Sequence, residues 1–158
     1  MGRSPSKSPF FFVYASLFSD FHVFLPFDDF TTSVLQTLNV APSQLHPNTW
    51  ASLQAFHLIC DMFCLSLTPS TFLNYYTSHP ANRVSWLSLV SWPGNTIFSS
   101  FTTSYKNFKG NFFKFYIEPK GSGLLFDEID RSNFPLYWTK NPTRFKKWTR
   151  SSSSIKEL

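Results

Sequence analysis

The stretch from Leu25 to Trp50 reads LPFDDFTTSVLQTLNVAPSQLHPNTW and holds one complete helical pattern, a linker and the start of a second helix. In the first pattern, apolar side chains recur at the 3.6-residue period of a single helix face. The residues on this face are Phe30, Val34, Leu35 and Leu38. Asp28 or Asp29 can cap the helix at its start, and Asn39 can end it because asparagine tolerates the left-handed conformation.

The linker that follows contains Pro42 and Pro47, and neither proline can continue a helix because it lacks a backbone N–H. We expect Leu45, between them, to anchor the linker in the core. Asn48 is the expected cap of the longest helix, which runs to about Cys64. Its apolar stripe consists of Trp50, Leu53, Phe56, His57, Cys60, Phe63 and Cys64. Leu58, Ile59 and Met62 widen that stripe, so we expect this helix to be central.

Further along the chain, Thr68 and Pro69 predict a third helix that ends near His79. After Arg83 the sequence becomes β-branched, aromatic and partly alternating, as strands are. The expected strands cover residues 84–92, 96–98 and 111–118. In the last of these, Phe113, Phe115 and Ile117 should face one way and Lys114 and Tyr116 the other.

These elements predict an α+β fold, in which an N-terminal three-helix cluster over about 28–79 packs on a small antiparallel sheet over about 84–118. Residues 1–9 are rich in Ser, Pro and Lys and predict a disordered N-terminus. Residues 10–138 form the single expected domain, and 10–27 are its apolar arm. Residues 139–158 form a basic, Ser-rich tail.

Composition sets limits on the class of protein. Of the 158 residues, 42% are hydrophobic and 15% are charged, whereas an average chain carries about 25% charge. The twenty Phe exceed what one small core needs, so we expect some to lie exposed or to contact a partner. The net charge of +5 equals that of residues 139–158, which hold six basic residues and one acidic residue.

No apolar run reaches the roughly 18 residues that span a membrane. Arg3 and Lys7 precede an apolar run as in a signal peptide, but no cleavage site follows it. Cys60 and Cys64 are the only cysteines, too few for a secreted disulfide scaffold. We therefore expect reduced thiols in an intracellular protein, nuclear or cytoplasmic, without a membrane partner.

The residues support no familiar catalytic centre. The nine acidic residues lie mostly at helix caps and in one loop, so we expect no carboxylate pair for a metal-dependent nuclease or polymerase. His57, Cys60 and Cys64 share a helix face but lack the paired spacing of a zinc site, and a core histidine beside two buried thiols is the better interpretation. Gly121–Gly123 lacks the pattern of a phosphate loop. We predict no catalytic residues, no metal, no cofactor and no small-molecule substrate.

The candidate binding segment is the basic stretch near the C-terminus, where cations alternate with aromatic rings. Such a segment can neutralise phosphates and stack on unpaired bases of RNA or single-stranded DNA. Its candidate residues are Lys140, Arg144, Lys146, Lys147, Trp148 and Arg150. The same residues suit a weak nuclear localisation signal, or a solubilising, mobile end whose aromatics cover the edge of the core.

The order and spacing of several motifs resemble the gypsy-type transposon domain family of plants, found near the start of many retrotransposon-derived proteins. The residues that carry the resemblance are Leu25–Phe27, Leu38–Trp50, Phe56–Cys60, Phe72–Tyr76, Trp86–Leu89, Tyr105–Lys109, Phe112–Lys114 and Phe134–Trp138. The resemblance implies a gag-like or accessory product without catalytic residues. Family members continue into a charged, often coiled-coil region, and this chain ends in Ser151–Leu158 instead, which implies a truncated copy.

Two functions of different classes follow. The first is a non-enzymatic interaction or assembly domain, which self-associates or binds a protein partner through exposed Phe and Tyr. The second is single-stranded nucleic-acid binding through Lys140–Arg150. A degenerate gene product without a cellular role is the third possibility.

Overall fold

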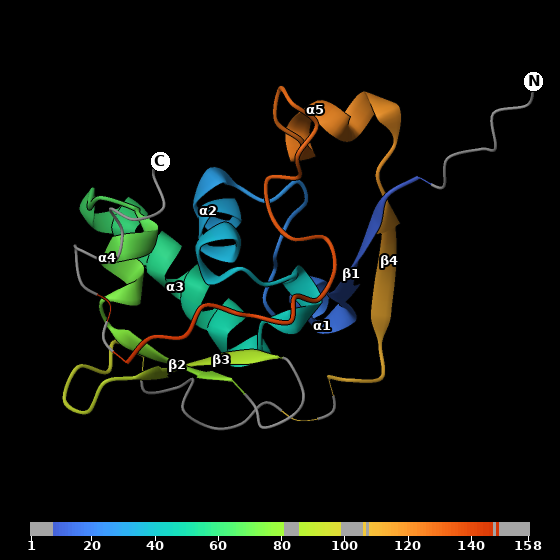
Figure 1. Ribbon diagram of the computed structural model, residues 1–158. Coiled ribbons are helices and arrows are strands. Elements are labelled where there is room, and N and C mark those ends of the chain that lie inside the picture. The colour runs from blue at the N-terminus through green and yellow to red at the C-terminus, as the bar shows by residue number, and fades with distance from the viewer. Residues whose placement is uncertain (1–7, 81–85, 99–105, 107, 147, 149–158) are drawn as a thin grey trace, which may run out of the picture.

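The computed structural model of the protein describes residues 8–80, 86–98, 106, 108–146 and 148 (Figure 1). Short helices and two separate two-stranded antiparallel sheets alternate along the chain, so the predicted α+β class is confirmed. The strands are β1 (Phe10–Tyr14), β2 (Tyr76–Pro80), β3 (Leu87–Ser91) and β4 (Phe112–Tyr116). The helices are α1 (Ala15–Ser19), α2 (Asp29–Leu38), η1 (Pro42–Gln44), α3 (Pro47–Phe63), α4 (Pro69–Leu73), η3 (Pro119–Gly121) and α5 (Ser122–Leu125).

The strand pairing differs from the prediction of one sheet over 84–118. β4 pairs with β1, and β3 pairs with β2, both antiparallel. The predicted strand at 96–98 is wrong, because β3 finds its partner upstream in the chain rather than in a returning strand. The predicted helix up to His79 is also wrong, since α4 ends at Leu73 and the β-prone residues Tyr76 and Thr77 enter the sheet with β3.

Helix ends follow the expected chemistry, with one change. Asp28 caps α2 by accepting a 2.7 Å hydrogen bond from the amide of Thr31, and Asn39 ends α2 in the left-handed conformation. α3 is capped by His46 rather than by Asn48, because Pro47 occupies the first helical position and the cap is the residue before it. The ring Nδ1 of His46 accepts a 3.1 Å hydrogen bond from the amide of Asn48.

The core lies between α2, the first half of α3, α4 and the inner faces of the two sheets. Trp50 is fully buried at its centre, and its Nε1 donates to the carbonyl of Pro42 at 3.1 Å. The predicted anchor Leu45 is also fully buried and forms a bridge with Leu87 of β3. None of the described helices is long and apolar enough to cross a membrane.

The chain returns across the domain in a segment that we name the strap, residues 134–146 (red in Figure 1). Phe134 is buried, so this end of the chain packs back on the domain. Thr139 exchanges hydrogen bonds with the side chain of Gln44, and the amide of Thr143 donates to the carbonyl of Leu38 at 2.8 Å. Residues after 138 in the strap therefore also contact the fold. Residues 1–7 and 149–158 of the expected N-terminal and C-terminal tails lie outside the described residues.

Candidate functional site

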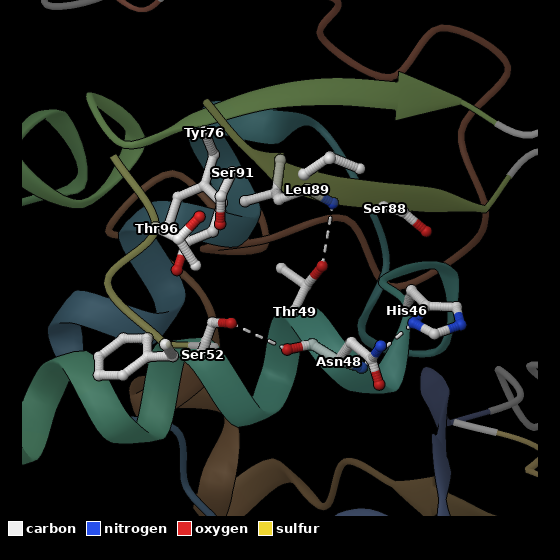
Figure 2. A pocket seen from close by; sticks show the side chains of 11 residues that line it. His46, Asn48, Thr49, Ser52, Tyr76, Ser88, Leu89, Ser91 and Thr96 are labelled. Atoms are coloured by element: carbon white, nitrogen blue, oxygen red, sulfur yellow. Dashed lines mark hydrogen bonds between the residues drawn. The ribbon is translucent and has the colours of Figure 1, made fainter. Parts of the chain in front are cut away.

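A polar cavity of about 270 Å³ lies between the start of α3 and the sheet of β2 and β3 (Figure 2). Residues with hydroxyl side chains make up much of its lining: Thr49, Ser52, Tyr76, Ser88, Ser91 and Thr96. Several of these polar groups already have structural partners. The hydroxyl of Thr49 accepts a 3.1 Å hydrogen bond from the amide of Leu89, and the hydroxyl of Ser52 donates to the carbonyl of Asn48.

The titratable groups of this cavity are His46 and Tyr76. Burial, together with the positive charge of Lys109, lowers the pKa of His46, and its Nδ1 is engaged as the cap of α3. Burial raises the pKa of Tyr76, although a hydrogen bond with Ser52 opposes the change. Among the described residues, the lining holds no carboxylate and no thiol. The described polar groups of the cavity connect α3 to the sheet, and they include no nucleophile paired with a carboxylate or a free base.

The His57, Cys60 and Cys64 face of α3 does not form the expected core cluster. His57 is partly exposed and lies between two carboxylates, with its Nδ1 2.9 Å from Asp28 Oδ2 and its Nε2 3.5 Å from Asp61 Oδ2. Cys60 is buried, but Cys64 is exposed because α3 ends at Phe63 and the left-handed cap turns the chain outward. Burial and the nearby Asp61 raise the pKa of the Cys60 thiol. In the described ranges, no three His, Cys, Asp or Glu residues converge on a metal site.

Only some residues of the predicted nucleic-acid-binding segment are exposed on the surface. Lys140, Arg144 and Lys146 are exposed along the strap. Trp148 is only 5% exposed and packs edge-on against Phe145, so its ring belongs to the core edge and is not available to a base. Lys147 and Arg150 lie outside the described residues.

One outer surface brings together exposed rings that are distant in the sequence. We name it the aromatic face: Phe10 and Phe12 of β1, Phe112, Lys114 and Tyr116 of β4, and Tyr137 of the strap. The register pairs Phe10 with Tyr116 and Phe12 with Lys114, so these side chains share one side of the sheet. The predicted alternation in β4 placed Lys114 and Tyr116 on the same side, as observed, but no sequence pattern indicated that β1 would supply the second row of rings.

A second exposed surface lies at the end of α3. Leu58, Met62, Phe63 and Leu65 are each more than half exposed, and we name this group the α3 tip. The expectation that Leu58 and Met62 widen a buried stripe is wrong for this end of the helix. The buried residues of α3 lie mostly in its first half, and its last turns extend past the elements that cover it.

Residues 12–77 match the family model described as "Putative gypsy type transposon". The predicted relation to gypsy-type transposons is thereby confirmed over the part of the chain from β1 to β2. The α3 tip lies inside the matched stretch, whereas β4 and the strap lie outside it. No curated protein and no solved structure matches the chain.

Proposed function

We propose that this chain is a non-enzymatic, gag-like or accessory domain of a gypsy-type retroelement and that it acts in protein interaction or assembly. The observation that carries the proposal is the α3 tip. It lies within the residues that match the transposon family, and it exposes large apolar side chains where the rest of α3 is packed. Contiguous exposed apolar surface of this kind marks interaction sites in soluble proteins.

The α3 tip has the geometry of a contact surface. Leu58 and Met62 are four residues apart in α3, so they lie along one side of the helix, and Leu65 follows just after its C-cap. They are 61%, 67% and 56% exposed, respectively. Burying one such side chain stabilises a complex by about 1.5–3 kcal/mol. Methionine adapts its shape to a partner, which suits a self-complementary surface.

The proposed occupant of the α3 tip is a second copy of the chain. A two-fold axis through this surface would set the same apolar side chains against each other. Asp61 lies among them, and its carboxylate Oδ2 is 3.5 Å from the His57 Nε2. Because the contact is apolar, self-association should persist in high salt.

Sedimentation velocity over a range of concentrations tests the proposal. The wild-type chain should self-associate at both low and high salt, and Met62→Lys should shift it toward the monomer. Ile129→Lys is the matched control, because Ile129 is equally exposed, at 67%, but lies in the loop after α5. A wild-type chain that stays monomeric at high concentration would overturn the proposal.

The wider proposal includes a single domain over 10–138 and a location inside the cell, in the nucleus or cytoplasm, without a membrane partner. The absence of catalysis is also part of it. The alternative function, single-stranded nucleic-acid binding through Lys140–Arg150, loses one of its stacking rings because Trp148 is buried.

A further inference from the structure

The β1–β4 sheet buries most of one side, where Phe113 is the exception at 51% exposure, and leaves rings on the other side, where Tyr14 is buried. Phe11 and Val13 point into the core and are at most 2% exposed, while the neighbouring Phe12 is 40% exposed. On β4, Phe112 and Tyr116 are 46% and 62% exposed. The rings of the aromatic face therefore remain partly exposed to water after the core is complete.

A cation lies among these rings. The ammonium of Lys114 is 4.0 Å from the centre of the Phe10 ring and 4.9 Å from the centre of the Tyr116 ring. A lysine held against aromatic rings places positive charge beside surfaces on which flat groups can stack. Phosphate and base are the two parts of a nucleotide that these groups recognise.

The strap extends the aromatic face beyond the sheet. The ring of Tyr137 packs edge-on against Phe10 at 5.3 Å between centroids. The next residue, Trp138, is 41% exposed, and its Nε1 donates a 2.7 Å hydrogen bond to the hydroxyl of Ser43 in η1. Lys140 follows as an exposed cation. Rings from three segments of the chain thus form one surface with a lysine in β4 and another on the strap.

The outer edge of β4 is open but unsuited to a second copy of the strand. The amide of Ala15 donates to the carbonyl of Asn111, so the ladder requires the N–H and C=O groups of Phe112, Lys114 and Tyr116 to point away from β1. Two β4 strands paired symmetrically about Lys114 would place two ammonium groups opposite each other, which is destabilising. A lysine in an edge strand commonly prevents such pairing.

We infer that the aromatic face, extended by Trp138 and Lys140, binds single-stranded nucleic acid, by stacking of unpaired bases on its rings and by contact of Lys114 with a phosphate. Adjacent strands lie about 4.8 Å apart, and alternate residues lie about 6.7 Å apart along a strand, so successive bases can reach different rings. Lys114 lies within this surface, and Glu118 and Lys140 each lie two residues along the chain from one of its rings. Duplexes do not offer free base faces, so unpaired strands are the preferred ligand.

Fluorescence anisotropy with a labelled uridine dodecamer tests this inference on the full chain at low and moderate salt. Tyr116→Ala should weaken binding between about 5-fold and about 150-fold, the range measured for loss of one stacking contact. Lys114→Gln should weaken binding and reduce the slope of log affinity against log salt by about 0.7, whereas Lys114→Arg should keep it. Circular dichroism of each variant confirms that the fold is retained.

Two matched controls separate this surface from others. Phe24→Ala removes a ring that is 80% exposed outside the aromatic face, and Lys146→Gln removes an exposed cation at the far end of the strap. Both should bind as the wild type does. The inference is overturned if the wild-type chain does not bind at low salt, or if Lys146→Gln loses binding while Lys114→Gln keeps it. It is also overturned if Tyr116→Ala abolishes self-association and leaves RNA binding unchanged, because the face would then be a protein interface.

Discussion

The two sheets of this protein are alike in size and differ in their outer surfaces. Each pairs two five-residue strands in antiparallel register and buries one side against the helices. The outer side of β2 and β3 carries Thr77, His79, Ser88 and Val90. The corresponding side of β1 and β4 carries the buried Tyr14 and the more exposed Phe10, Phe12, Phe112, Lys114 and Tyr116. The β2–β3 sheet shows that a sheet of this size can have a largely polar outer side in this fold. Packing against the helices therefore does not explain why the β1–β4 sheet exposes aromatic rings.

The edge strands of the two sheets also differ in whether their outward backbone groups have hydrogen-bond partners. Both edges of the β2–β3 sheet have hydrogen-bond partners, because Leu89 donates to Thr49 on one edge and Ser78 donates to the carbonyl of Phe145 on the other. The outer edge of β4, in the part of the chain that the structure describes, has Lys114 at its centre and no backbone partner. One sheet is enclosed by the domain, and the other presents a side and an edge to solvent.

The largest expected effect separates the two sides of β1. Phe11 contacts the rings of Phe27, Phe115 and Phe134, so Phe11→Ala should lower the free energy of unfolding by about 3–5 kcal/mol. Phe12→Ala, one residue along, should cost about 1 kcal/mol or less, because its ring is exposed and only its cross-strand contacts are lost. Urea unfolding followed by tryptophan fluorescence measures both values.

If Phe11→Ala proves too unstable to purify, Phe11→Leu keeps most of the buried volume and should cost less than about 1.5 kcal/mol. Equal losses for the alanine variants at positions 11 and 12 would mean that both sides of β1 are packed, and the contrast between the sheets would fail.

Removing the hydrogen bond that holds the β2–β3 sheet to α3 should have a smaller effect on the free energy of unfolding. Thr49 is 1% exposed, and its hydroxyl is the acceptor for the amide of Leu89. Thr49→Val keeps the shape but leaves a buried N–H without an acceptor, which should cost about 1–3 kcal/mol of unfolding free energy. Thr49→Ser retains the hydroxyl and should cost less. Hydrogen exchange at the Leu89 amide should quicken only in the valine variant, and unchanged exchange there would show that Thr49 does not hold β3.

Local chemistry was predictable from the sequence where neighbours in the chain decide the structure. Asp28, Asn39 and Thr68 act at helix ends as expected, and the alternation in β4 placed Lys114 and Tyr116 on one side. Strand partners were not predictable, because Phe10 and Tyr116 meet across almost the whole domain. For that reason, the contribution of β1 to the aromatic face could not be predicted from the sequence. The burial of Trp148 likewise depends on the path of the strap, which no local pattern encodes.

The cap of α3 makes the enclosed sheet sensitive to pH. Burial and the charge of Lys109 lower the folded-state pKa of His46 below its unfolded value of about 6.5. The unfolded chain therefore binds more protons between these two pKa values, and stability should fall as pH drops from 7 through 6.5. Protonation would also remove the Nδ1 acceptor of the cap and place positive charge at a helix N-terminus.

Urea unfolding at pH 7 and pH 5 measures this dependence. His46→Asn keeps a capping oxygen and should lose less stability between the two pH values than the wild type, while His46→Ala should cost about 1 kcal/mol at pH 7. His79→Asn is the matched control, since His79 lies exposed on the outer side of β2. An identical loss between pH 7 and 5 in the wild type and His46→Asn would show that other groups set the dependence.

The smallest effect on stability should come from making the two outer surfaces alike. Phe12→Thr, Phe112→Ser and Tyr116→His give the aromatic face side chains of the kind on the outer side of β2 and β3. Each change should alter the free energy of unfolding by about 1 kcal/mol or less, because cross-strand pairs contribute only that much. The triple variant should nevertheless lose RNA binding, measured by anisotropy beside urea unfolding. A binding loss that greatly exceeds the stability loss would show that the rings serve recognition, whereas a variant that unfolds would show that they serve the fold.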